Sequence, residues 1–251
     1  VEVLEAAGFQ VVVPKQNLCC GRPLYDFGML DRAERLLRQI LDALKDEIRA
    51  GTPLVALEPS CLAVFRDELP NLFPDSEDAK RLTAQAFSLS EFLLQRAPDF
   101  KPPHLPRKAI VHGHCHHKAL LTIASEEAML KKFGLHYEIL DSGCCGMAGS
   151  FGFEREHYDV SIQVGELVLL PAVRQADEET LIIADGFSCR EQIAQTTERR
   201  ALHPAEVMEM ALREGMDEGS AAHEHRRLHE QKQRAEQVNP QPRKLPVSGA
   251  G

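Results

Sequence analysis

The apolar residues of the chain follow two alternating patterns. Short apolar runs with β-branched residues predict buried strands, at residues 11–13, 54–57, 108–111, 137–140 and 181–184. Between these runs, apolar residues recur three and four positions apart and predict helices, at residues 31–50, 88–96, 125–132, 156–169 and 204–213. Asp31 and Glu34 resemble a capping box that opens the first of these helices, and Gly51 ends it. Alternating strands and helices predict an α/β fold with mostly parallel sheets.

Composition divides the chain into three parts. Residues 101–107 are rich in proline and predict a linker between a first domain, residues 1–101, and a second domain, residues 102–216. From residue 217 the chain is charged, rich in glutamine and without aromatic residues, so we expect a disordered tail over residues 217–251.

Two vicinal cysteine pairs, each followed by glycine, repeat within this pattern: Cys19-Cys20-Gly21 and Cys144-Cys145-Gly146. Each pair follows a short helix, a glycine and an apolar run, and each precedes a helix, a second apolar run and a single cysteine. The single cysteine is Cys61 in one half (61 − 20 = 41 positions on) and Cys189 in the other (189 − 145 = 44). We interpret this as two similar tandem α/β domains, a duplicated unit of roughly 100 residues.

The second half has one further cysteine, Cys115, which precedes Cys144 by 29 positions. The equivalent position in the first half would lie before Val1. The chain also starts with valine and inside a predicted helix. We therefore expect the sequence to be the C-terminal part of a longer polypeptide and the first domain to be truncated.

The predicted strands place the cysteines together. All seven lie just beyond the carboxyl ends of predicted strands, the sheet edge where ligands collect in α/β proteins. Thiolates there suit zinc or an iron–sulfur cluster. No C-x₂₋₄-C knuckle is present, and adjacent cysteines can reach different irons of a multi-iron cluster more easily than they chelate one ion. We predict metal binding by the four cysteines of the second half, and a second or degenerate metal site in the first half: Cys115, Cys144, Cys145 and Cys189; Cys19, Cys20 and Cys61.

More than one role for the cysteines stays open at this point. A lone cysteine after a strand is commonly a small buried apolar residue, and Cys61 could be one. A vicinal disulfide, a reactive thiol pair and a zinc site are further possibilities. The histidines around Cys115 are His112, His114, His116 and His117. They could ligate metal, transfer protons or anchor a substrate carboxylate, or simply form a polar loop. We place His114, His116 and His117 at the mouth of the site.

Overall composition narrows the function classes. The net charge of −9 argues against nucleic-acid binding, and the 43% hydrophobic content supports a real core. No apolar run is long enough for a transmembrane helix, and no signal peptide is visible. The cysteines are therefore better explained by metal or redox chemistry than by a disulfide scaffold.

On these motifs the chain resembles the cysteine-rich (CCG) domain pair of the glycolate oxidase iron–sulfur subunit and the heterodisulfide reductase B subunit. The HGHCHHKAL segment at residues 112–120 is most similar to fused FAD-linked 2-hydroxy-acid dehydrogenase/iron–sulfur proteins. The family pattern ends in Cys-x-x-Cys. This chain has Glu58-x-x-Cys61 and Gly186-x-x-Cys189 instead, so each half lacks one family cysteine.

The resemblance implies an electron-transfer part of an oxidoreductase. A [4Fe-4S] cluster on the second-half cysteines would take electrons from FAD in a missing domain or partner subunit that oxidises D-lactate, glycolate or 2-hydroxyglutarate. The acceptor would be the quinone pool or another carrier. The implied location is cytoplasmic, or peripheral at the inner membrane. Two rival functions are a heterodisulfide or thiol reductase subunit, which the absent fifth cysteines disfavour, and a zinc-stabilised or metal-free structural domain.

Overall fold

The computed structural model describes residues 1–121 and 123–214. It contains two parallel sheets, one in each half of the chain. In the first, β1 (Leu54–Ala56) pairs with β2 (Ala86–Ser88). In the second, β3 (Lys108–His112) lies between β4 (His136–Ile139) and β5 (Leu181–Ala184). The predicted α/β class with parallel strands is confirmed. The predicted duplication stays a prediction.

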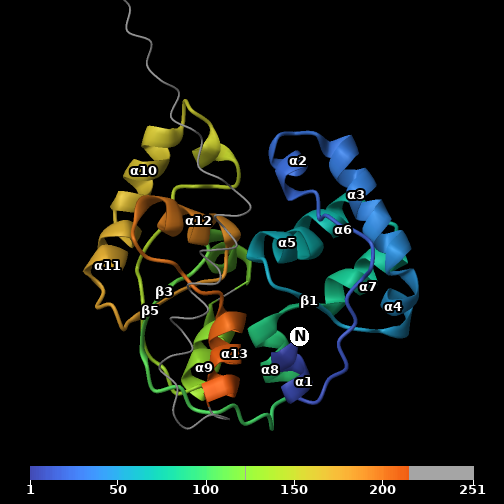
Figure 1. Ribbon diagram of the computed structural model, residues 1–251. Helices are drawn as coiled ribbons and strands as arrows, with labels where there is room; N and C mark the ends of the chain where they lie inside the picture. Colours follow the sequence, from blue (N-terminus) through green and yellow to red (C-terminus); the bar gives the residue numbers. More distant parts are fainter. Residues whose placement is uncertain (122, 215–251) are drawn as a thin grey trace, which may run out of the picture.

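Helices of the first half gather on one side of the molecule (Figure 1). Their order along the chain is α2 (Arg22–Asp26), α3 (Leu30–Ala43), α4 (Lys45–Ala50), α5 (Pro59–Ala63), the π-helical turn η1 (Val64–Glu68), α6 (Leu69–Leu72) and α7 (Glu77–Gln85). The apolar face of α3, with Leu37, Ile40 and Leu41, is buried against Leu62 of α5 and Leu82 of α7. This packing fixes the start of α5 beside the end of β1.

The second half surrounds the three-stranded sheet. The π-helical turn η2 (His117–Leu121) and α9 (Ala124–Lys132) follow β3, and the 3₁₀ turn η3 (Phe151–Phe153), α10 (Tyr158–Glu166) and α11 (Leu169–Gln175) follow β4; after β5 come α12 (Phe187–Thr196) and α13 (Pro204–Glu214). The register aligns Val111 of β3 with Ile139 and Ile183. All four residues of β5 are buried, as expected for a strand covered on both faces. The carboxyl ends of the three parallel strands therefore meet at one edge.

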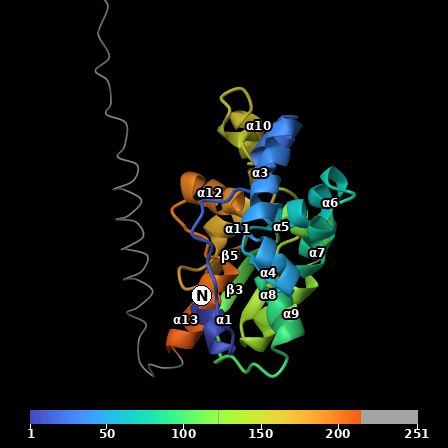
Figure 2. The same cartoon turned by 90° about the vertical axis from the view of Figure 1, so that its right-hand side faces the viewer.

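One core joins the two halves. Val3 of α1 (Glu2–Ala6) and Leu89 and Leu93 of α8 (Leu89–Arg96) pack in the same cluster as Met129 of α9 and Val207 of α13. Figure 2 shows α8 beside α9 and α1 beside α13. The proline-rich segment at 101–107 contributes too, because Leu105 is 1% exposed. Residues on both sides of the predicted domain boundary thus share apolar packing.

Several expected elements differ from the structure. Residues 11–13 are extended but pair with no described strand, and Val12 and Val13 are 66% and 68% exposed. The helix expected at 31–50 begins at Leu30 and is interrupted at Leu44, and no side chain caps its start. The capping box lies instead at Ser88 and Glu91, where both reciprocal hydrogen bonds form.

Two further differences concern later segments. The helix expected at 156–169 is divided into α10 and α11 by the non-helical backbone of Val168. Strand β2 was not predicted from sequence. The tail predicted to be disordered, residues 217–251, lies outside the described residues.

Candidate metal centre

The carboxyl edge of the three-stranded sheet brings the four second-half cysteines together. Cys115 lies just after β3, Cys144 and Cys145 follow β4, and Cys189 is the third residue of α12, directly after β5. Their side chains interact in a row: Cys115 with Cys144, Cys144 with Cys145, and Cys145 with Cys189. The sequence prediction that these residues meet at one sheet edge agrees with this arrangement.

The pKa shifts alternate in direction along the row. Hydrogen bonds from Cys115 and Cys145 lower the pKa of Cys144 to about 2. The same bonds raise the pKa values of Cys115 and Cys145, and burial raises them further. A hydrogen bond with Cys145 and a smaller effect of a hydrogen bond with His112 lower the pKa of Cys189 to about 6, although burial of Cys189 acts in the opposite direction. The site therefore stabilises thiolates, the form of cysteine that binds metals.

The spacing of the sulfur atoms bears on which group could fit. In the described part of the chain, no three cysteine sulfurs lie within 4.8 Å of one another. A zinc ion with Zn–S bonds of about 2.3 Å would need all four sulfurs about 3.8 Å apart. Four cysteine sulfurs at one sheet edge, two of them from adjacent residues, are the thiolate donor set that an iron–sulfur cluster uses.

The Cys-Cys-Gly motif has the same local geometry in both halves. The amide of Gly146 donates to the sulfur of Cys144 at 3.4 Å, and the amide of Gly21 donates to that of Cys19 at 3.5 Å. Both glycines have positive φ, +98° and +78°. A Cβ on Gly146 would lie 2.0 Å from the Ser161 carbonyl of α10. Glycine is needed here for the left-handed turn and for close packing of the loop against α10.

The first-half cysteines form a smaller group. The sulfur atoms of Cys20 and Cys61 lie 2.9 Å apart, whereas Cys19 is exposed. The hydrogen bond with Cys61 lowers the pKa of Cys20 to about 7 and raises that of Cys61. Cys61 is the third residue of α5, as Cys189 is of α12. The structure thus brings together two of these three thiols.

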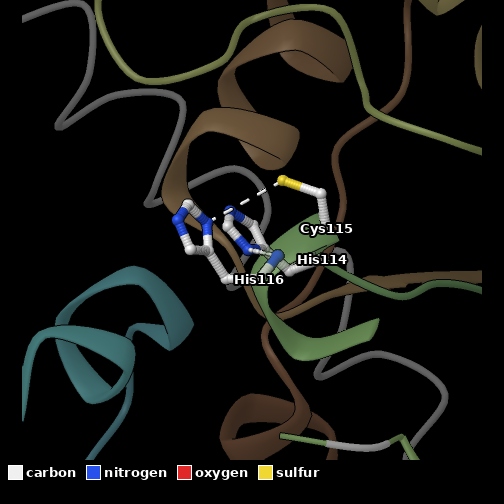
Figure 3. A group of neighbouring side chains, drawn as sticks. All are labelled: His114, Cys115 and His116. Atoms are coloured by element: carbon white, nitrogen blue, oxygen red, sulfur yellow. Dashed lines mark hydrogen bonds between the residues drawn. The ribbon is translucent and has the colours of Figure 1, made fainter. Parts of the chain in front are cut away.

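Two histidines stand beside Cys115 (Figure 3). The rings of His114 and His116 are stacked with centroids 5.2 Å apart, and Nδ1 of His116 lies 3.8 Å from the Cys115 sulfur. Ligand atoms of these three residues all lie within 4.8 Å of one another. His116 is half-buried, and burial, with the positive charge of Arg22, lowers its pKa. Of the three histidines placed at the site mouth from sequence, His116 is the most accessible.

His114 is buried and fills the space above Gly186. A Cβ at position 186 would lie 2.1 Å from Cδ2 of the His114 ring. Gly186 stands where the family pattern has a cysteine, so in this chain the imidazole occupies the room beside that position.

His112 reaches the thiol row from the end of β3. Its Nδ1 lies 2.7 Å from the Ser142 hydroxyl, and its side chain also interacts with Cys189. Lys118 donates to the Ser142 carbonyl. From the sequence, His112 was noted only as one of the histidines around Cys115. Its two partners, Ser142 and Cys189, are far from it along the chain.

His117 is buried and turns toward two carboxylates. Its Nδ1 lies 2.6 Å from Asp185 and 3.5 Å from Glu126. Burial, the charge of Asp185 and a hydrogen bond to it raise the pKa of Glu126 well above its ordinary value. Burial opposes ionisation of Asp185 too, but bonding to His117 keeps its pKa low. Sequence reasoning missed both acids.

Glu58 links the two cysteine-bearing helices. Its carboxylate caps α5 through the Ser60 amide and hydroxyl, and accepts a 2.8 Å hydrogen bond from the Phe187 amide at the start of α12. The other position at which a family cysteine is absent is therefore used to join the halves.

Comparisons with known proteins agree with this cysteine pattern. A family model described as a cysteine-rich domain (CCG) matches residues 1–66. Lactate utilization protein A of Bacillus velezensis is 30% identical over 222 residues, which cover 83% of this chain and 90% of that protein. D-2-hydroxyglutarate dehydrogenase of Pseudomonas putida is 28% identical over 190 residues, covering 75% of this chain and 18% of that protein.

A third relative is also longer than this chain. It is one subunit of the anaerobic glycerol-3-phosphate dehydrogenase of Escherichia coli, 30% identical over 219 residues, and the match covers 84% of this chain and about half (54%) of that protein. Within the described residues, no helix has the length and apolarity to cross a membrane. The extent of the match to lactate utilization protein A, with the match of residues 1–66 to the cysteine-rich domain model, shows that the chain belongs to this CCG cysteine-rich domain family.

Proposed function

We propose that Cys115, Cys144, Cys145 and Cys189 hold a [4Fe-4S] cluster, and that the chain is the electron-transfer part of an FAD-linked 2-hydroxy-acid dehydrogenase. When bound, such a cluster supplies a one-electron carrier between a two-electron donor and an acceptor. The observation that carries the proposal is the row of four thiols at one sheet edge, where Cys115 follows β3, Cys144 and Cys145 follow β4, and Cys189 lies in α12 after β5.

The surrounding residues would tune the centre. The Gly146 amide donates to Cys144, and His112 interacts with Cys189. Hydrogen bonds to ligand sulfurs raise the potential of an iron–sulfur centre, as partial neutralisation of their charge favours the reduced state. Cys145 and Cys189 are buried, which excludes water from that side of the site.

The substrate class follows from the names of the relatives. One is a D-2-hydroxyglutarate dehydrogenase and another is a lactate utilization protein, so we favour a 2-hydroxy acid over glycerol 3-phosphate. The FAD and the substrate would lie in another domain or a partner subunit. The acceptor would be the quinone pool or another carrier, with the chain cytoplasmic or at the inner-membrane surface.

Electron acceptance tests this proposal directly. The anaerobically purified full chain should contain iron and sulfide, and photoreduced flavin should bleach its visible absorbance and produce an EPR signal of a reduced cluster. Protein that holds zinc, or that is iron-loaded but takes no electron from reduced flavin, would contradict the proposal.

A further inference from the structure

A second cluster of ligand-type side chains lies between the two sheets. It consists of His117 of η2, Glu126 of α9 and Asp185 at the end of β5, which are 2%, 2% and 4% exposed. Together they line a cavity whose other wall comes from the first half of the chain: the end of β1 and the start of α5, and the end of β2 with the start of α8. This cluster shares no residue with the row of four second-half cysteines.

We propose that His117, Glu126 and Asp185 bind a divalent first-row transition-metal ion. Nδ1 of His117 lies 2.6 Å from Oδ2 of Asp185 and 3.5 Å from Oε2 of Glu126, and all three ligand atoms lie within 4.8 Å of one another. Neighbouring ligands around an ion with bonds of about 2.1 Å are separated by about 3.0–3.4 Å. The three atoms therefore need only small shifts to surround an ion.

Unpartnered atoms point to a ligand independently of this spacing. In the described structure, Oε1 of Glu126, Oδ1 of Asp185 and Nε2 of His117 are buried without a hydrogen-bond partner. Buried polar atoms are almost always paired, so the two unpaired carboxylate oxygens in this cluster indicate a missing partner. A cation bound through both oxygens of each carboxylate would satisfy Oε1 and Oδ1.

The chemistry of the donor atoms indicates which ions would fit. Two carboxyl groups and the imidazoles of His117 and His203 line the cavity, together with Leu62, Leu89 and Leu121. Within the described ranges, both carboxylates form their ion pairs with His117. One nitrogen and several carboxylate oxygens suit manganese, iron or zinc better than a soft ion.

The site has room for more than protein ligands. Three protein residues leave coordination positions free, as in metal sites that also hold water or a small molecule. Those positions would face the cavity, where Ser88 and Ser90 also lie. The inference does not depend on the iron–sulfur cluster.

Manganese binding tests the proposal, since Mn²⁺ prefers oxygen and nitrogen ligands to thiolates. The full chain, with its cluster loaded, is freed of other metals by dialysis against a chelator and titrated with MnCl₂. Free Mn²⁺ is counted by EPR. We expect one tightly bound Mn²⁺ per chain, and at least tenfold weaker binding in Glu126→Gln and Asp185→Asn.

Matched controls separate this site from the others. Glu127→Gln removes the same charge from the neighbouring, partly exposed residue of α9 and should bind Mn²⁺ like the wild type. The double variant Cys144→Ser/Cys145→Ser should lose iron but keep Mn²⁺. If Asp185→Asn does not fold, Glu126→Gln decides alone, with Mn²⁺ expected to raise the unfolding temperature of the wild type and not of the variant. Equal binding by wild type and Glu126→Gln would overturn the proposal.

Discussion

At the scale of single residues, Gly186 illustrates how the thiol site is packed. Gly186→Ala would place a methyl group against the buried His114 ring, which a Cβ meets at 2.1 Å. We expect a loss of about 1–3 kcal/mol in the free energy of unfolding, because overpacking of a filled site forces side chains to move. Denaturant unfolding would measure it.

Gly143→Ala is the matched control for this substitution. A Cβ at Gly143 meets nothing within 4 Å, and its φ is not in the left-handed region. Its stability should change by less than about 0.5 kcal/mol. If both alanine variants were equally stable, the packing of His114 over Gly186 would be contradicted.

The sequence predicted the thiol residues better than the residues that support them. Cysteines adjacent in sequence are visible as a motif, and the strand ends explain why they meet. Glu126 and Asp185 carried no such signal, because an isolated acid is usually on the surface and Asp185 is 68 positions away from their shared partner, His117. The burial of His117 depends on the packing of η2 against the end of β5, which the sequence pattern does not predict.

At the scale of elements, an ion pair links η1 to α8. Arg66 donates two hydrogen bonds to Glu91, at 3.0 and 2.6 Å, and Glu91 also closes the capping box of α8. Burial raises the pKa of Glu91, but Arg66 and the Ser88 amide outweigh it, so the net shift is downward. Because the pKa of Glu91 is lower in the folded state, its ion pair contributes stability at pH values above the pKa of the unfolded state. This contribution is lost as the pH falls through the folded-state pKa.

We therefore expect Glu91→Gln to reduce the free energy of unfolding by about 1–3 kcal/mol at neutral pH, since it removes charged hydrogen bonds. The difference from wild type should shrink as the pH falls below 4.5, the ordinary pKa from which that of Glu91 is lowered. Urea unfolding at several pH values would show this. Asp78→Asn, which breaks the exposed pair with Arg49, should cost less. A constant deficit at every pH would argue against the pair.

Glu58 provides a second test at this scale. Glu58→Ala removes the cap of α5 and the acceptor for the Phe187 amide of α12. Loss of a helix cap costs about 0.5–2 kcal/mol, and we expect a value in this range by thermal or denaturant unfolding. Glu198→Ala, an exposed acid beyond α12, is the control and should be near neutral. A stable Glu58 variant would show that the link between the helices contributes little.

Elements were predictable where periodicity and burial agreed. Strands β3, β4 and β5 and helices α8, α9 and α13 lie close to their predicted positions. The apolar run at 11–13 failed as a strand because no described strand lies beside it to pair with its backbone. Strand β2 was missed because its Ala-Phe-Ser sequence is too short to show a period.

At the scale of the whole molecule, the shared core predicts that the halves depend on each other. A polypeptide of residues 102–251 would lose Val3, Leu89 and Leu93 from the core that also contains Met129 and Val207. We expect this fragment to show no cooperative thermal transition by circular dichroism, whereas the full chain does. A cooperative transition of the fragment at the midpoint of the full chain would contradict this dependence.

We propose that the second-half thiols hold one [4Fe-4S] cluster. Iron and sulfide analysis of the anaerobically reconstituted full chain tests it most directly when two double variants are compared. We predict about four irons and four sulfides per chain. Cys19→Ser/Cys20→Ser should retain them and Cys144→Ser/Cys145→Ser should lose them. Zinc in place of iron, or full iron content in the second variant, would contradict the account.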